Sequence, residues 1–217
     1  MTKHFFDALE LLKRDLLTMG GLVETAVLQA TRGFLTPDDA DVDRIIDGDA
    51  EVNALELRIE EECLHLLALY GPNARDLRFV VAVFKITNDL ERIADLAVNI
   101  AERIRPAIQE GQGMITAEVQ EMSDRVRRMV RQALDAFVAL DAGSAQEVLE
   151  MDDRVDDLLR DIYEQQSDAV GKGLIEFKPA VRTLSFAKSL ERIADHTTNV
   201  AEDVIYLATG DVIKHQY

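Results

Sequence analysis

Apolar residues recur along the chain with the three- and four-residue spacing of amphipathic helices. In the first segment, Met19, Val23, Val27, Ala30 and Phe34 share one helical face. Strand-like alternation of apolar and polar residues extends over no useful length. The pattern therefore predicts an all-α protein. The predicted helices span residues 4–35, 38–69, 74–106, 115–140, 145–170 and 178–209.

Glycine and proline mark the breaks between these helices, and both are scarce, with 11 and 4 residues. Thr36 followed by Pro37 predicts a helix start, because threonine caps a helix and proline fits its first position. Ser144 with Glu147 predicts a capping box at the start of another helix. Residues 106–113 hold one proline and two glycines and are predicted to form the main linker.

The second half of the chain repeats the first. Segment 90–102 matches segment 190–202 at 9 of 13 positions, and both begin with Leu-Glu-Arg-Ile-Ala-Asp. The other predicted helices pair at an offset of 103 residues. We therefore expect two tandem three-helix bundles, at residues 1–108 and 114–217, in which short loops make neighbouring helices antiparallel.

Acidic and amide residues gather opposite the apolar stripe of the third and sixth predicted helices, and one turn apart on the second and fifth. Carboxylates four residues apart on a helix repel each other, and asparagine is a poor helix former, yet both features occur twice. Converging carboxylate and amide oxygens make a site for a hard cation such as Mg²⁺, Mn²⁺ or iron. The candidate ligands are Asp49, Asn53, Glu91, Asp95 and Asn99 in the first bundle and Asp152, Asp156, Glu191, Asp195 and Asn199 in the second.

Other interpretations of these residues remain open. The acidic faces are equally typical of solvated helix surfaces that bind no metal. Glu62 and His65 have the Glu-x-x-His spacing of di-iron bundles, but that architecture needs the motif twice and residues 165–168 lack it. His196 is either a further ligand or, by preference, a surface residue. Cys63 lies at the apolar edge of its helix, which favours a packed thiol over a nucleophile.

Charge and composition exclude several classes of protein. The chain has 24 basic and 41 acidic residues, a net charge of −17 shared by both halves, which disfavours nucleic acid and anionic lipid as direct partners. A single cysteine excludes an intramolecular disulfide and a cysteine-cluster zinc site. No phosphate loop, His-Glu-x-x-His or Gly-x-Ser-x-Gly motif is present. Neither a membrane span nor the apolar core of a secretory signal is found, so we expect a cytoplasmic protein.

The motifs of the chain resemble those of the PhoU family. The doubled Leu-Glu-Arg-Ile-Ala-Asp, followed each time by Asn and Ala-Glu, carries the resemblance. It is joined by Met19-Gly20 and Val23-Glu24 in the first helix and by the Pro-x-Ala-x-Asp-Leu-Arg of residues 72–78 before the third. The likeness spans nearly the whole chain and includes the duplicated three-helix plan.

This resemblance implies a non-enzymatic, typically dimeric regulator. Such proteins restrain phosphate uptake and the phosphate-starvation response. They act as adaptors between the transporter ATPase subunit PstB and the sensor kinase PhoR. These partners can bring them to the inner membrane. Some members hold metal clusters on Glu/Asp-x-x-x-Asp motifs, which here correspond to residues 91–95 and 191–195.

By the same resemblance, the second and fifth helices complete two metal sites with Asp49, Asn53, Asp152 and Asp156. Asn53 departs from an all-acidic pattern, so we expect weaker binding at the first site. Iron, manganese, magnesium and zinc all remain candidates for the metal. A metal-storage or di-iron redox bundle and a metal-free acidic scaffold are the alternative functions.

Overall fold

The computed structural model describes residues 3–36, 39–110 and 114–211, and side chains are left undescribed at 39–41, 107, 109 and 110. Within these ranges the chain forms helices and no strand, which confirms the all-α prediction. The helices are α1 (Lys3–Leu35), α2 (Asp39–Tyr70), α3 (Ala74–Glu110), α4 (Ala117–Ala139), α5 (Ala142–Gly171) and α6 (Phe177–Thr209).

Two helix boundaries differ from the predictions by three residues or more. Helix α3 continues through Pro106 to Glu110, so the linker does not begin at the proline; residues 111–113 lie outside the described ranges. Helix α5 begins three residues before the predicted start, because Asp141 rather than Ser144 caps it. The Asp141 carboxylate accepts hydrogen bonds from the backbone N–H groups of Gly143 and Ser144. The start predicted at Thr36–Pro37 lies partly outside the described residues, and α2 begins at Asp39.

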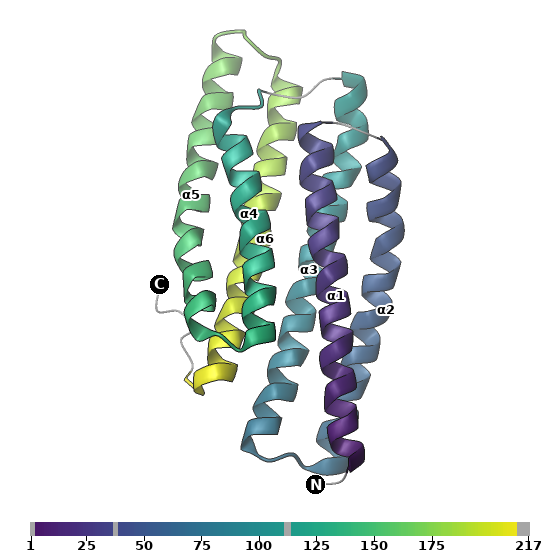
Figure 1. The fold of residues 1–217 in the computed structure, drawn as a ribbon. Helices are drawn as coiled ribbons and strands as arrows, with labels where there is room; N and C mark the ends of the chain where they lie inside the picture. Colours follow the sequence, from purple (N-terminus) through teal and green to yellow (C-terminus); the bar gives the residue numbers. More distant parts are fainter. Residues whose placement is uncertain (1–2, 37–38, 111–113, 212–217) are drawn as a thin grey trace.

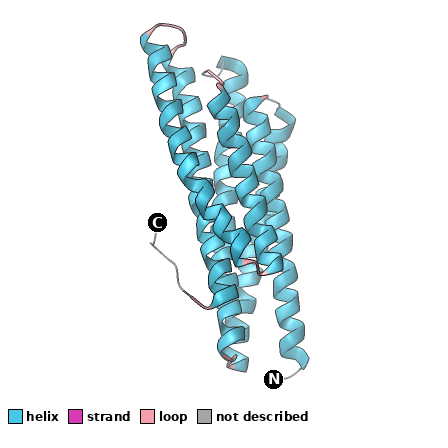
Figure 2. Cartoon of the chain, turned by 60° about the vertical axis from the view of Figure 1, so that its left-hand side comes forward, coloured by secondary structure: helices cyan, strands magenta, loops and turns pink. Residues whose placement is uncertain are grey.

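The six helices form two trios that lie side by side along the long axis of the molecule (Figure 1). Helices α1, α2 and α3 pack on one another, and so do α4, α5 and α6. The trios meet mainly where α3 packs against α6, with a smaller contact between α1 and α4. In both pairs the helices run in opposite directions (Figure 1). Viewed from a second side, the molecule is an elongated bundle with short connections (Figure 2).

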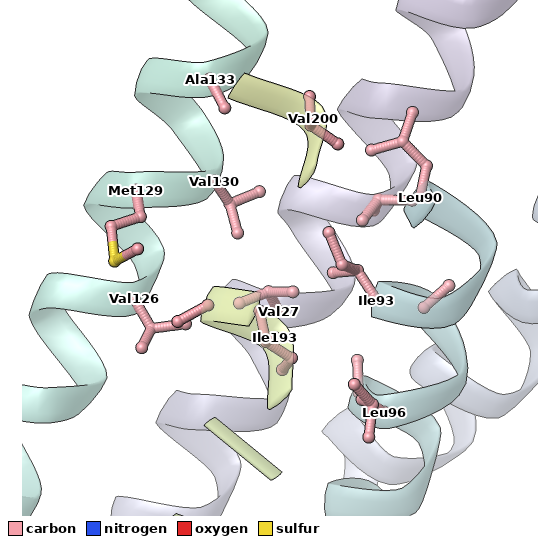
Figure 3. Packing of buried hydrophobic residues seen from close by; sticks show 14 of the residues in the cluster. Val27, Leu90, Ile93, Leu96, Val126, Met129, Val130, Ala133, Ile193 and Val200 are labelled. Atoms are coloured by element: carbon pink, nitrogen blue, oxygen red, sulfur yellow. The ribbon is translucent and has the colours of Figure 1, made fainter. Parts of the chain in front are cut away.

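A single cluster of buried apolar residues draws members from all six helices. Its centre lies between the trios, where Val27, Val130, Ile93 and Ile193 come from α1, α4, α3 and α6 (Figure 3). Nearby, the rings of Phe34 and Phe186 stack with their centroids 3.9 Å apart. Burial of apolar surface stabilises both trios together, because each one covers part of the other's apolar face.

A small residue in α1 leaves space for a leucine side chain of α4. A Cβ atom at Gly20 would lie 2.7 Å from Cδ2 of Leu134, whereas one at Gly21 would meet nothing within 4 Å. Helix α1 runs unbroken through both glycines. The absence of a side chain at Gly20 therefore makes room for Leu134, while α1 shows no break at this point.

Candidate metal centres

The first group of predicted ligands lies between α2 and α3. Asn53 Nδ2 donates a hydrogen bond to Asp49 Oδ2 at 2.9 Å, so the two α2 residues are neighbours. The other oxygen, Asp49 Oδ1, is buried and has no hydrogen-bond partner. Burial raises the pKa of Asp49; the Asn53 hydrogen bond opposes this shift and the charge of Asp95 adds to it. The second and third helices thus bring their acidic residues within electrostatic reach of each other.

Glu91 of α3 belongs to the same group. Burial raises its pKa, and the charges of Asp95, Glu56 and Asp49 raise it further, while Arg92 lowers it. Arg92 Nε lies 3.4 Å from Glu91 Oε2, and its Nη1 lies 3.5 Å from Asp95 Oδ2. Because Arg92 is largely exposed, water screens these contacts and the negative charge of the group is only partly offset.

Glu56 is a member of this group that the sequence did not single out. It lies seven residues after Asp49, which places both on the same side of α2. Burial raises its pKa, as do the charges of Glu60 and Asp95, while Arg92 opposes the shift. Its counterpart in the second half is Leu159, so a search for duplicated acids could not find it. The seven-residue spacing was the available signal.

The second group, between α5 and α6, is more crowded. The pKa of Asp152 is raised to about 7, first by burial and then by the charges of Asp195, Asp156, Asp153 and Glu191. The first group has an asparagine, Asn53, among its predicted ligands on α2. The second group has an aspartate, Asp156, at the corresponding position. Like charges held this close favour a bound cation or proton.

Asp195 and Glu191 extend this group along α6. The pKa of Asp195 is raised by burial and by the charges of Glu191 and Asp156, while Lys188 and His196 oppose the shift. Glu191 Oε1 accepts a hydrogen bond from Lys188 Nζ at 2.6 Å. Its other oxygen, Oε2, is buried and has no hydrogen-bond partner, as Asp49 Oδ1 is in the first group.

The donor atoms of both groups suit a hard cation, since they are carboxylate and amide oxygens. The two buried oxygens without partners are the kind of atom that a metal ion would satisfy. Among the described residues, however, no three His, Cys, Asp or Glu side chains form an arrangement that could hold a metal ion. The residues present therefore suit a metal in their chemistry, but as placed their oxygens do not form a coordination group.

Two of the three predicted asparagine ligands, Asn99 and Asn199, point elsewhere. Asn99 Nδ2 donates to the backbone oxygen of Asp95 at 2.8 Å. Asn199 Nδ2 donates to Asp89 Oδ1 at 3.1 Å, across the contact between the trios. His196 Nδ1 lies 2.8 Å from the same Asp89 oxygen, and its side chain is 24 % exposed. His196 is therefore a partly exposed residue that contacts Asp89 of α3.

Cys63 and His65 show no arrangement for catalysis. Cys63 is fully buried, and burial raises the pKa of its thiol to about 12, so the thiol is a packed group as predicted. His65 is largely exposed, with its Nδ1 4.0 Å from Glu62 Oε2.

None of the helices in the described ranges combines the length and the apolar character that crossing a membrane requires.

Comparison with known proteins places the fold in a class of duplicated helical bundles. The family model described as the PhoU domain matches twice, at residues 16–104 and 119–204. The "Phosphate-specific transport system accessory protein PhoU homolog" of Pseudomonas putida is 37% identical over 221 residues, which cover 99% of this chain and 84% of that protein. The homologue from Aquifex aeolicus is 36% identical over 212 residues, covering 98% of this chain and 96% of that protein.

Solved structures agree with these matches. The crystal structure of PhoU from Pseudomonas aeruginosa has a TM-score of 0.92 and 35% identity, and covers 95% of this chain and 100% of that one. The phosphate transport system regulatory protein PhoU from Streptococcus pneumoniae gives a TM-score of 0.87 at 27% identity, covering 96% and 99% of the two chains. The chain belongs to the PhoU family. This is a family of accessory and regulatory proteins, and the chain is not an enzyme.

Proposed function

We propose that this protein is a cytoplasmic accessory regulator of a phosphate-specific transport system. It restrains phosphate uptake and the phosphate-starvation response by acting as an adaptor between the transporter ATPase subunit and the sensor kinase. The likeness to phosphate transport accessory proteins along 99% of the chain supports the system in which it works. We expect the protein to form a dimer. Light scattering after size-exclusion chromatography measures the molar mass of the assembly and tests this expectation.

Metal binding at the two acidic groups is the proposed basis of regulation. The observation that carries it is the crowding around Asp152, whose pKa of about 7 reflects burial beside several carboxylates. In the first group Asp49, Asn53, Glu91 and Asp95 would hold a divalent or trivalent cation, and in the second Asp152, Asp156, Glu191 and Asp195. Such a cation would neutralise the repulsion between helices and so bias which protein surface a partner meets.

The test compares Asp152→Asn/Asp195→Asn with the wild type. Metal content is measured by mass spectrometry, and binding of Mn²⁺ and Fe²⁺ by calorimetry under anaerobic conditions. A matched control is Asp157→Asn, because Asp157 is an exposed acid on the same helix whose carboxylate lies 3.1 Å from Arg160. We expect the double variant to lose about half of the bound metal and the control to lose none. Equal metal content in all three proteins would refute the proposal.

A metal-free acidic scaffold is the second candidate function. It is favoured by the lack, among described residues, of a ready coordination group. In that case the acidic faces dock basic partner surfaces directly, so binding to the transporter ATPase subunit weakens steeply as salt rises. Chelators distinguish the two candidates: EDTA weakens partner binding if a metal is required and leaves it unchanged if the scaffold works alone.

A further inference from the structure

A groove between α1 and α4 carries a concentration of positive charge that the acidic helix faces do not explain. It has a volume of about 400 Å³, and α4 lines it with Arg127, Arg128 and Arg131. Val27 of α1 and Val130 of α4 also line it, and both side chains are almost fully buried. The two helices run antiparallel here (Figure 1). We refer to these three arginines and the space beside them as the arginine groove.

Two of these arginines have carboxylate partners on their own helix, and the third has none among the described residues. Arg127 Nη1 lies 3.1 Å from Asp124 Oδ1, in a pair that is largely exposed. Arg131 Nε lies 3.8 Å from Asp135 Oδ2, and both side chains are more than 70% exposed. Within the described ranges Arg128 forms neither an ion pair nor a hydrogen bond. The chain has 41 acidic and 24 basic residues, so three arginines on two successive turns of one helix form a local positive region on a protein of net negative charge.

The duplicated fold does not require arginine at these positions. At an offset of 103 residues, Arg127, Arg128 and Arg131 correspond to Glu24, Thr25 and Leu28 of α1. The packing of α4 rests instead on buried apolar residues such as Val126 and Val130. A change confined to one copy and located outside the core points to a role that the first copy does not share.

The chemistry of the groove suits a phosphate oxyanion. Arginine presents a planar fork of N–H donors that matches the oxygens of phosphate, and segment 125–131 contains four arginines and no lysine. Residues three and four apart are neighbours on a helix, so Arg131 can reach the same ion as Arg127 or Arg128. Glu24 and Asp124 also line the groove and oppose an anion. Because the Asp124 pair is exposed, its exchange for a stronger ligand requires little free energy.

We propose that the arginine groove binds a phosphate oxyanion, supplied either by inorganic phosphate or by a condensed phosphate such as pyrophosphate. The regulatory meaning of this site rests on the proposed function. The site would give the regulator a direct contact with the ion whose uptake it restrains. It does not depend on the acidic groups, which lie on α2, α3, α5 and α6. The groove lies where α1 and α4 make the smaller contact between the trios, and all three of its arginines come from α4.

The experiment titrates chelator-treated wild-type protein with sodium phosphate, pyrophosphate and sulfate in calorimetry, at two salt concentrations. The same titrations are made on Arg128→Gln/Arg131→Gln and on Arg160→Gln, which removes an exposed arginine of α5. We expect saturable binding that weakens with salt, a loss of at least about tenfold in affinity in the double variant, and no change in the α5 control. Tighter binding of phosphate than of pyrophosphate identifies free phosphate as the source of the oxyanion. Tighter binding of pyrophosphate identifies a condensed phosphate.

Arg128→Lys/Arg131→Lys keeps the charge and removes the forks, so an intermediate affinity supports bidentate binding. Circular dichroism confirms that each variant is folded. The proposal is overturned if folded wild-type protein binds neither phosphate nor pyrophosphate, if sulfate binds as tightly as both, or if the double variant binds as the wild type does. Metal content is measured in parallel and is expected to stay unchanged in the groove variants. Failure of the groove proposal can therefore be told apart from failure of the metal proposal.

Discussion

The ammonium group of Lys85 on α3 lies 2.7 Å from the carboxylate of Asp203 on α6 and links the two trios. Asp203 is 2% exposed, whereas the Lys85 side chain reaches solvent. The same ammonium lies 5.9 Å from the centre of the Tyr206 ring. The pair thus holds a buried negative charge at the largest contact between the halves of the molecule.

Removal of the cation from this pair is predicted to destabilise the protein. Lys85→Met leaves Asp203 buried opposite an apolar group, and we expect a loss of about 2 kcal/mol of unfolding free energy, since solvent reaches the lysine and moderates the effect. Urea denaturation measures it. The control is Lys172→Met, which breaks the exposed pair with Asp168 and should change stability by less than about 0.5 kcal/mol. Equal effects of both changes would contradict the special role of the buried pair.

Stability of the metal-free protein is predicted to depend on Asp152. Its pKa in the folded protein is raised from 3.8 to about 7, so the folded state binds this proton more strongly than the unfolded state does. The contribution of Asp152 is therefore favourable at low pH and is lost as pH rises from about 4 to about 7. Above that range the ionised carboxylate weighs against folding.

Asp152→Asn should remove this part of the pH dependence. We expect the variant to be more stable than wild type at pH 8, by about 1–2 kcal/mol after allowance for solvent screening, with the difference shrinking toward pH 4. Thermal unfolding across this pH range, in the presence of EDTA, measures the difference. A constant difference at all pH values would show that Asp152 titrates normally in the folded protein.

The two glycines in the middle of α1 are predicted to respond oppositely to substitution. Gly21→Ala meets no atom within 4 Å and gains helix propensity, so it should stabilise the protein by about 0.5–1 kcal/mol. Gly20→Val instead forces Leu134 away, because even its Cβ would lie 2.7 Å from that side chain, and should destabilise by about 1–3 kcal/mol. Thermal unfolding of the two variants measures both signs. A stabilising Gly20→Val would show that α1 and α4 are not closely packed.

The stacked rings of Phe34 and Phe186 are predicted to be a major support of the contact between trios. Phe186→Ala should cost about 3–5 kcal/mol, because it leaves a cavity beside Phe34 in the shared core. Phe177→Ala on the same helix is the control, since that ring is 73% exposed and its loss should change stability by about 0.5 kcal/mol or less. Chemical denaturation measures the unfolding free energy of both variants. A similar loss of stability in each would contradict the prediction.

Local pattern accounts for the success of the helix predictions. The spacing of Val126, Met129 and Val130 identifies a buried helical face without knowledge of what covers it, because residues three and four apart always share a side of a helix. Helix ends were less predictable. Asp141 and Ser144 are both good caps, and the choice between them depends on where α4 ends and how α5 docks.

The sequence by itself determined the duplicated all-helical plan and the acidic stripes, since both follow from periodicity along single helices. The tertiary structure decided which of these residues meet. Asn199 faces Asp89 rather than Asp195, Glu56 joins the first acidic group, and Lys85 reaches Asp203. Such contacts depend on the rotation and register of helices that are distant in the chain, which packing of the shared core sets and local spacing does not encode.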